Sequence, residues 1–76
     1  MKNKKIIQDV LEDCNISEVI PSDTLDDLDF DSLSSINLMS IMSNDYDIEI
    51  DPEEIQKLTT LEDLDNFISN KLNNSD

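Results

Sequence analysis

The chain has 76 residues, which suffice for a single domain over residues 1–76 with a modest core. It carries 19 acidic and 5 basic residues, a formal net charge of −14, and it contains no histidine and no glycine. This charge repels nucleic acid and anionic membrane surfaces, and no apolar run approaches the roughly 20 residues that span a bilayer. We therefore expect no nucleic-acid partner and no membrane insertion.

The first residues do not resemble an export signal. Residues 1–7 are basic and then apolar, but Gln8 and Asp9 interrupt the apolar run before the core of a signal peptide is reached. We therefore expect a cytoplasmic protein. Cys14 is the one cysteine, which excludes an internal disulfide framework and a thiolate cluster for zinc. Its place on an apolar helix stripe predicts a small core residue.

The first half of the chain predicts one helix and a long connection. The helix is expected over residues 4–14, where Ile7, Val10, Leu11 and Cys14 recur at steps of three and four. Residues 15–31 lack a helical period and contain turn residues at 21–23, so we expect a long, ordered loop. The apolar residues expected to pin this loop to the helices are Ile16, Val19, Ile20, Leu25, Leu28 and Phe30.

A second helix is predicted over residues 32–45, with Asp31 or Ser32 supplying the side-chain oxygen that caps its first turn. Its period predicts a broad apolar face. The residues expected on that face are Leu33, Ile36, Met39 and Met42, with Leu38 and Ile41 beside them.

Two further helices complete the prediction. A short one over residues 52–58 has Asp51 as its cap, Pro52 at its first position and Glu54 completing a capping box. Another over residues 61–72 has Thr60 as its cap. Its inward-facing residues are expected to be Leu61, Leu64, Phe67 and Ile68. The fold class is therefore all-α, a bundle of three main helices and one short helix.

The residues present disfavour a metal site and catalysis. Asp27, Asp29 and Asp31 alternate like the first ligands of a calcium loop, but Ser32 stands where glycine is needed and Leu38 where a bidentate glutamate is needed. No histidine or second cysteine is available to activate a serine, and so small a domain has little room for a pocket that tunes paired carboxylates. We therefore predict no metal site and no catalytic residue, and hence no enzyme.

One segment is more specific than the rest. Residues 28–33 read Leu-Asp-Phe-Asp-Ser-Leu and place Asp31-Ser32-Leu33 at the start of the second predicted helix. This segment resembles the attachment motif of acyl carrier proteins. The likeness continues through Ile36, Leu38, Met39 and Met42 to residues 46–50, 53–54, 58–61 and 67–68, and so covers most of the chain. A serine at a helix start also exposes its hydroxyl, and free amides there favour a phosphodiester.

The resemblance implies an acyl-carrier bundle with phosphopantetheine attached covalently to Ser32. A phosphopantetheinyl transferase would move this arm from coenzyme A, with Asp31 binding the transferase's magnesium or orienting the serine, and Leu33 as part of the motif. The arm would carry acyl groups as thioesters, and Ile36 and Met39 with the bundle interior would receive a short acyl chain. Further partners would be acyl or aminoacyl ligases, synthases and transferases. The carrier that they bind is expected to be a monomer. The residues expected to contact them are Ile36, Asn37, Met39 and Ser40.

The chain departs from the family in two places. Acyl carrier proteins usually have glycine where Asp29 stands, but aspartate tolerates a left-handed backbone better than most residues, so we expect the turn to survive. Carriers of fatty acid synthesis commonly show acids on helix two, whereas the matching face here is expected to be neutral and to contain Ser34, Asn37, Ser43 and Asn44. Ser34 and Ser35 are expected on the helix surface. The neutral face favours a dedicated partner set over general fatty acid synthesis, within the fatty acid or polyketide biosynthesis that the resemblance implies.

Two alternatives stay open at this point. In the first, the chain carries aminoacyl or peptidyl groups. In the second, it is an acidic helical interaction module that is never modified, and Ser32 serves only as a helix cap.

Overall fold

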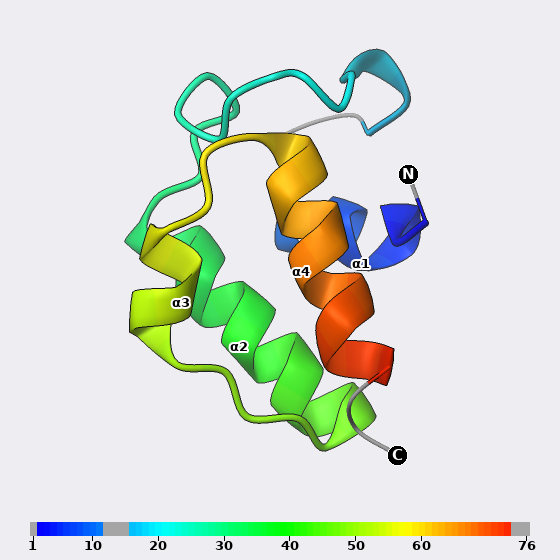
Figure 1. The fold of residues 1–76 in the computed structure, drawn as a ribbon, viewed down its shortest axis with the longest axis vertical. Coiled ribbons are helices and arrows are strands. Elements are labelled where there is room, and N and C mark those ends of the chain that lie inside the picture. The colour runs from blue at the N-terminus through cyan, green and yellow to red at the C-terminus, as the bar shows by residue number, and fades with distance from the viewer. Residues whose placement is uncertain (1, 12–15, 74–76) are drawn as a thin grey trace.

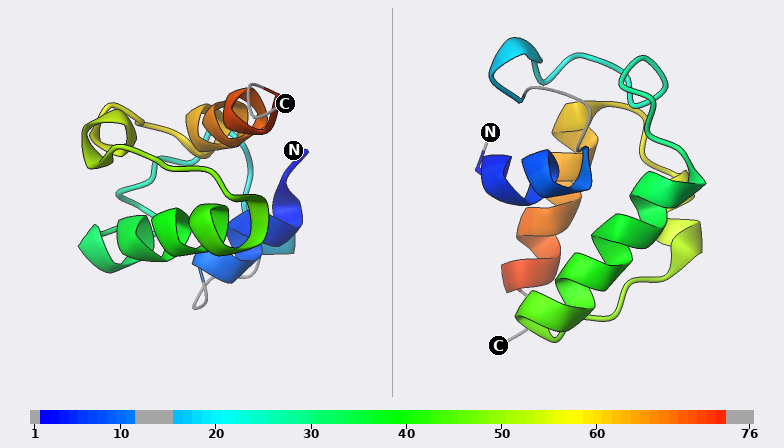
Figure 2. Two further views of the ribbon diagram at one scale, coloured as in Figure 1. Left: turned by 90° about the horizontal axis from the view of Figure 1, so that it is seen from below. Right: turned by 180° about the vertical axis from the view of Figure 1, so that it is seen from behind.

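The computed structural model describes residues 2–11 and 16–73, and it has four α-helices in the predicted order. Their bounds are α1 (Lys4–Val10), α2 (Ser32–Tyr46), α3 (Pro52–Gln56) and α4 (Leu61–Asn73). The long helices α2 and α4 lie side by side, and α1 crosses behind α4 (Figure 1). The chain after α2 runs back along that helix and places the short α3 near its first half (Figure 2). The predicted all-α four-helix class is confirmed.

The core lies where α1, α2 and α4 meet. Six large side chains are fully buried there, and each contributes about 1.5–3 kcal/mol through removal of apolar surface from water. They are Ile7, Leu38, Met42, Leu61, Leu64 and Ile68. The predicted inward face of α4 is confirmed, since Leu61, Leu64 and Ile68 are fully buried and Phe67 packs partly buried against the core.

Helix α1 is shorter than the predicted 4–14. It ends at Val10, and Leu11 leaves the helical backbone region while its N–H still donates to the Ile7 carbonyl. Glu12 and Asp13 follow in the sequence, and negative charge at a helix C-terminus opposes the helix dipole. Cys14, predicted to be a core residue, lies outside the described residues.

The start of α1 is held by α4 through an interaction that the sequence pattern did not indicate. Asp65, in the middle of α4, is 7% exposed, and its Oδ1 accepts hydrogen bonds from the backbone N–H of Asn3 at 2.9 Å and of Lys2 at 3.2 Å. The Asn3 side chain donates to Asp65 and to Ser69 Oγ at 2.8 Å. A carboxylate of a different helix therefore supplies the acceptors that fix the chain ahead of α1.

Helix α2 buries only part of the broad apolar face that the sequence predicts. Its buried residues are Ser34, Leu38 and Met42, whereas Leu33 is 69% exposed and Ile36 is 52% exposed. The prediction that Ser34 lies on the surface is therefore wrong. Helix α1 packs against α2, and Leu38 and Met42 belong to the common core, whereas Leu33 and Ile36 do not.

The end of α2 depends on an aspartate in a glycine-like role. Asp47 has φ 57° and ψ 39°, and its N–H donates to the carbonyls of Met42 and Ser43, while the Ile48 N–H donates to Met42 at 2.9 Å. This is the left-handed helix end at which glycine is usual. Aspartate is one of the few other residues that adopt it at low cost. The helix therefore reaches Tyr46 in a chain without glycine.

The long loop is ordered by backbone bonds to the start of α4. The carbonyls of Asp23 and Pro21 accept from the N–H groups of Leu61 and Glu62 at 2.8 and 2.9 Å, and the Leu25 N–H donates to Thr59 at 2.9 Å. These bonds satisfy amides that a helix start leaves free. The loop also contains a short 3-10 helix, η1 (Ile16–Glu18), which was not predicted.

The apolar residues of the long loop differ in burial. Leu25 and Leu28 are buried and Val19 and Phe30 pack partly buried on the core, as predicted, but Ile20 is 55% exposed and does not pin the loop. The side chain of Ile16 lies outside what the structure describes.

The caps of α3 and α4 are confirmed. Asp51 and Glu54 form the predicted capping box at α3, and Thr60 Oγ1 accepts from the Asp63 N–H at 3.2 Å at the start of α4. Helix α3 ends at Gln56 instead of residue 58, because the N–H groups of Lys57 and Leu58 bond three residues back and tighten the chain into a turn.

Candidate functional site

Ser32 is the first residue of α2, and its side chain is exposed. Its neighbour Asp31 is the helix cap, with Oδ1 accepting from the N–H groups of Leu33 at 3.0 Å and Ser34 at 3.1 Å. Of the two predicted caps, Asp31 is therefore the one used. Within the part of the chain that the structure describes, no hydrogen bond engages the Ser32 hydroxyl. Asp31 thus holds the helix start rigid and leaves the serine available.

The turn before the motif takes the expected left-handed form. Asp29 has φ 57°, and its N–H donates to the Asp26 carbonyl at 3.2 Å. The next residue, Phe30, returns its N–H to the Leu25 carbonyl at 2.9 Å. The prediction that Asp29 replaces the usual glycine without loss of the turn is confirmed. This turn leads the chain directly into Asp31 and Ser32.

The expectation of free amides beside Ser32 is corrected. The N–H groups of Leu33 and Ser34 already donate to Asp31, and that of Ser35 donates to the Asp31 carbonyl at 3.0 Å. A phosphodiester on Ser32 would therefore find these three donors occupied and a carboxylate beside them. We expect such a group to extend toward solvent.

A pocket of about 460 Å³ opens beside Ser32, between the first half of α2, α3 and the end of the long loop. Polar side chains contribute to its lining, and the remainder is apolar. The apolar lining residues are Leu25, Phe30, Ile36, Met39, Pro52, Ile55 and Leu58, and the polar ones are Asp26, Asp31, Ser32, Ser35 and Gln56. A hollow with a mainly apolar lining thus lies next to the serine that the sequence singled out.

The pocket brings together four of the predicted site residues. Asp31, Ser32, Ile36 and Met39 line it, whereas Leu33, Asn37 and Ser40 do not. Leu33 and Ser40 are exposed outside the pocket, and Asn37 is half-buried. The lining residues from α3 and the loop were not predicted as site residues, because their periodicity indicates burial and does not tell which helix they face.

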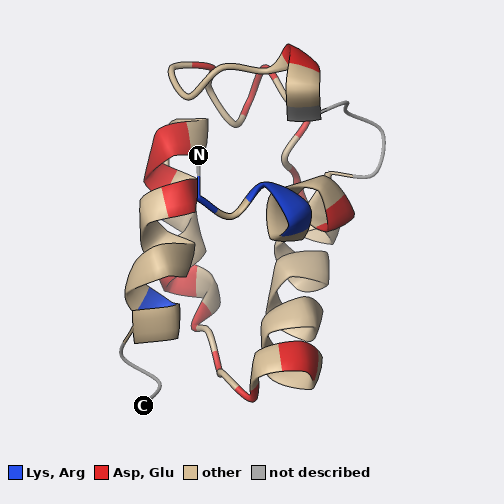
Figure 3. Ribbon diagram, turned by 90° about the vertical axis from the view of Figure 1, so that its right-hand side faces the viewer, with Lys and Arg blue, Asp and Glu red and all other residues tan. Residues whose placement is uncertain are grey.

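Charged residues are absent from α2 until its last turn (Figure 3). The exposed face of this helix differs in membership from the prediction, since Ser34 is buried, but it remains neutral. It contains Leu33, Ile36, Ser40, Ser43 and Asn44. Exposed acids lie on either side of it, at Asp26, Asp27, Asp29 and Asp31 before the helix and at Asp45, Asp47 and Glu49 from its end onward.

Glu54 of α3, which does not itself line the pocket, has a pKa below its ordinary value of 4.5 because the Lys71 side chain donates to it and the Asp51 N–H does likewise. A lowered folded-state pKa favours the folded protein above pH 4.5, and this contribution is lost as the pH falls through the folded pKa. We expect the variant K71M to raise the pKa of Glu54 toward 4.5, as measured by an NMR titration of its carboxyl carbon. An unchanged pKa in K71M would show that Lys71 does not cause the shift.

The described residues contain neither a cluster that could hold a metal ion nor a helix that could span a membrane. Among residues 2–11 and 16–73, no three acidic or sulfur-bearing side chains are placed to hold a metal ion together. In the same ranges, every helix is too short or too polar to cross a bilayer.

Comparison with known proteins agrees with this geometry. Residues 4–68 match the family model described as "Phosphopantetheine attachment site". The chain is 39% identical over 71 residues to the acyl carrier protein of Desulforapulum autotrophicum, with 92% of each chain covered. It is 35% identical over 75 residues to that of Petrotoga mobilis, covering 99% of this chain and 88% of the relative. It is also 36% identical over 72 residues to that of Thermosynechococcus vestitus, covering 93% of this chain and 88% of the relative. The chain therefore belongs to the acyl carrier protein family, whose cofactor is phosphopantetheine.

Proposed function

We propose that Ser32 is the residue to which phosphopantetheine is attached, and that the chain carries acyl groups for a dedicated biosynthetic pathway. The observation that supports this most strongly is the unengaged, exposed hydroxyl of Ser32 at the start of α2, directly beside an apolar pocket. The two neighbouring serines in the first turns of this helix are less suited to attachment. Ser34 is buried, and Ser35 Oγ donates to the Asp31 carbonyl at 3.3 Å.

The residues around Ser32 fit the arm. Ser32 is exposed, so a transferase can reach its oxygen, and the Asp31 cap keeps the first turn of α2 rigid while it does so. In the transfer, the Ser32 oxygen forms a bond to the phosphorus that coenzyme A contributes. The pyrophosphate bond of coenzyme A breaks, adenosine bisphosphate leaves, and the serine proton passes to the transferase. Asp31 would orient the serine or help to hold the transferase's magnesium.

Once attached, phosphopantetheine supplies a terminal thiol that holds acyl groups as thioesters. The chain's own residues would then act by binding. Leu25, Phe30 and Met39 offer apolar surface to a short acyl chain, and Met39 adapts to cargo of different shape because its side chain is flexible. Chemistry on the cargo would be performed by partner enzymes in the cytoplasm, so the chain itself would not be an enzyme.

The partner surface would be the neutral outer face of α2 and its border. Leu33 and Ile36 offer exposed apolar contacts, and Asn37, Met39 and Ser40 lie on the same helix. The acids before and after α2 would steer basic partners toward it over longer range, while close contacts would be apolar and uncharged. Acyl or aminoacyl ligases, synthases and transferases that recognise such a face would be the partners.

This surface leads to a prediction about exchange with general fatty acid synthesis. We expect fatty acid synthesis enzymes that bind acidic helices to turn over the loaded protein at least about tenfold less efficiently than their own carrier, since the basic residues of the enzyme would find no acid on α2 until Asp45. The measurement is kcat/KM for a malonyl transferase with both carriers. Equal efficiency would contradict the dedicated partner set.

The experiment that tests the proposed function is loading. The purified protein is incubated with coenzyme A, magnesium and a broad-specificity phosphopantetheinyl transferase, and its intact mass is measured. We expect a gain of one phosphopantetheine per chain. An unchanged mass, under conditions that load a control carrier, would favour the unmodified interaction module in which Ser32 is only part of a helix start.

The aminoacyl or peptidyl carrier is the second candidate. Asp26 and Asp31 place two carboxylates on the lining of the pocket, and they would suit a cargo with a free amine. Loading of the holo-protein by amino-acid ligases and by acyl ligases, compared at equal enzyme concentration, separates the two cargo classes.

A further inference from the structure

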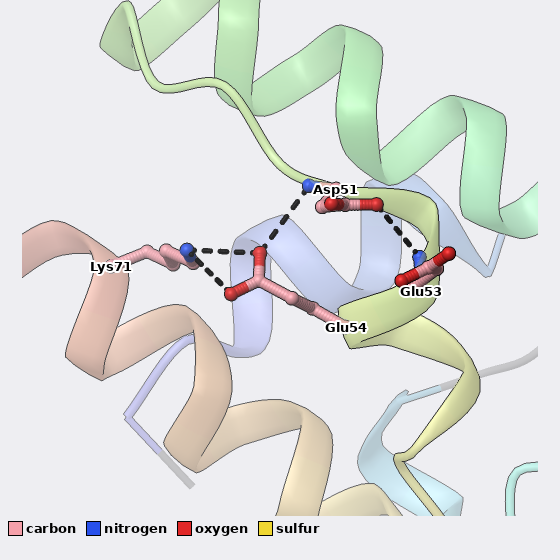
Figure 4. A network of polar contacts seen from close by, with 4 residues as sticks. All are labelled: Asp51, Glu53, Glu54 and Lys71. Carbon is pink, nitrogen blue, oxygen red and sulfur yellow. Dashed lines mark hydrogen bonds and ion pairs between the residues drawn. The ribbon is translucent and has the colours of Figure 1, made fainter.

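Helix α3 is joined to α4 by an ion pair that lies behind the pocket wall (Figure 4). The Lys71 ammonium, in the last turn of α4, is 3.0 Å from Oε2 and 3.1 Å from Oε1 of Glu54. It also lies 5.5 Å from the centre of the Phe67 ring, a cation–π contact on its own helix. The side chain of Lys71 is 27% exposed and that of Glu54 is 41% exposed, so water screens the ion pair only in part.

The same Glu54 carboxylate also closes the start of α3. Its Oε2 accepts from the Asp51 N–H at 3.3 Å, while Asp51 Oδ1 accepts from the Glu53 N–H at 3.1 Å (Figure 4). Lys71 therefore contacts the one side chain that both caps α3 and reaches another helix. Among the hydrogen bonds and ion pairs of residues 2–11 and 16–73, the contact between Lys71 and Glu54 is the one that joins a charged side chain of α3 to another helix.

Helix α3 has few anchoring contacts of its own. It has five residues, too few for a helix that is stable by itself, and Ile55 is its one buried side chain. The flanking chain is anchored on both sides, since Ile50 before the helix is buried and Leu58 after it packs against the core. Ile55, together with Pro52 and Gln56, lines the pocket opposite the Ser32 end of α2. The position of α3 thus decides the width of the pocket, and within the helix this position depends on Ile55 and on the contact of Glu54 with Lys71.

We propose that Lys71 is a positioning residue for the carried group: by holding Glu54 it fixes α3 as the pocket wall opposite Ser32, and it thereby controls how well an acyl chain on the arm is shielded from solvent. This inference rests on the proposed function, because the carried group must enter this pocket. The two parts are tested separately below.

The first test uses the unmodified protein and does not depend on loading. Amide hydrogen exchange is measured by NMR for Asp51 and Leu58, whose N–H groups bond within the α3 region, and for Leu64, whose N–H donates to the Thr60 carbonyl in α4. In K71M we expect exchange at Asp51 and Leu58 to rise about two- to fivefold, the size typical of a partly exposed ion pair, with Leu64 unchanged.

Two variants control this test. K71R keeps the charge and a donor for Glu54, so it should restore wild-type exchange. K57M removes the same charge from an exposed lysine at the end of α3 that makes no ion pair within the described residues and acts on Glu54 less than Lys71 does, so its effect should be clearly smaller than that of K71M. An equal rise at Leu64 in K71M, or the same rise in K57M, would overturn the proposal, because the effect would then be global or due to net charge.

The second test uses the holo-protein loaded with a hexanoyl group, and loading is verified by intact mass before the assay. The rate of thioester cleavage by hydroxylamine is followed by loss of the hexanoyl mass. We expect cleavage about two- to fivefold faster in K71M than in wild type, K71R and K57M. Equal rates in all four proteins would overturn the positioning role even if α3 is loosened. Failure of wild type to load would instead contradict the proposed function and leave the exchange result as the test of the contact.

Discussion

We expect the replacement of Ser32 by Ala to abolish loading by the transferase and to leave the fold intact. The variant loses the one hydroxyl at the start of α2 that is exposed and unengaged within the described residues, so no oxygen of similar reach remains beside the pocket. Its free energy of unfolding should change by no more than about 0.5 kcal/mol, because the side chain is at the surface and Asp31 supplies the cap. The readouts are intact mass after incubation with coenzyme A and a urea unfolding curve.

Two serines on the same helix provide the matched controls. Ser35 and Ser40 lie three and eight positions further along the chain, and S35A and S40A should load to completion. If S32A still gains the mass of one phosphopantetheine, or if S35A fails to load while remaining folded, the assignment of the attachment residue is incorrect.

Replacing Leu38 by Ala should remove most of the stability of the protein. Leu38 is 0% exposed at the centre of the core, and large-to-small substitutions at such sites cost about 2–5 kcal/mol. A domain of this size rarely has more than about 3–5 kcal/mol in total. We therefore expect a large fall in the urea midpoint and a partly unfolded population in the absence of urea.

Leu33 is the control for this prediction, since it is the same residue type on the same helix but 69% exposed. L33A should change the free energy of unfolding by no more than about 0.5 kcal/mol. The sequence pattern alone places Leu33 on the broad apolar face of this helix and Leu38 beside it, and does not tell which of the two is buried. Equal destabilisation by the two substitutions would contradict the burial seen in the structure.

The difference in burial between Leu33 and Leu38 shows what the sequence pattern cannot determine. The period of apolar residues in α2 predicts one broad apolar face, and the structure buries only the part of it that contains Leu38 and Met42. A partner-facing stripe of Leu33 and Ile36 has the same pattern as a core stripe. Periodicity shows which side chains are apolar but not what covers them, so it could not tell which part of the face would be buried.

Features that depend on residues close together in the sequence, such as helix caps, were predicted more reliably. The cap at Asp31, the capping box of Asp51 and Glu54, and the cap at Thr60 follow from side chains that bond within a few residues, and the structure confirms all of them. Asp29 was also predicted correctly in its left-handed turn. The bond from Asp65 to the chain before α1 joins residues more than sixty positions apart, and no local pattern indicates it.

Only the wall of the candidate site that is formed by the motif and α2 could be predicted from the sequence. Asp31, Ser32, Ile36 and Met39 were named from the motif and its helix, and all four line the pocket. The opposite wall, formed by Pro52, Ile55 and Gln56 of α3, depends on how the chain after α2 folds back. That return path is fixed by the helix end at Asp47 and the contact of Glu54 with Lys71, neither of which was assigned from the sequence.

The measurement that tests the central claim most directly is localisation of the modification in the wild-type protein. After loading with coenzyme A and transferase, the protein is digested and the modified peptide is fragmented in a mass spectrometer. The account predicts a single phosphopantetheine on the Ser32 oxygen. A modification found on Ser34, Ser35 or any other residue would contradict it.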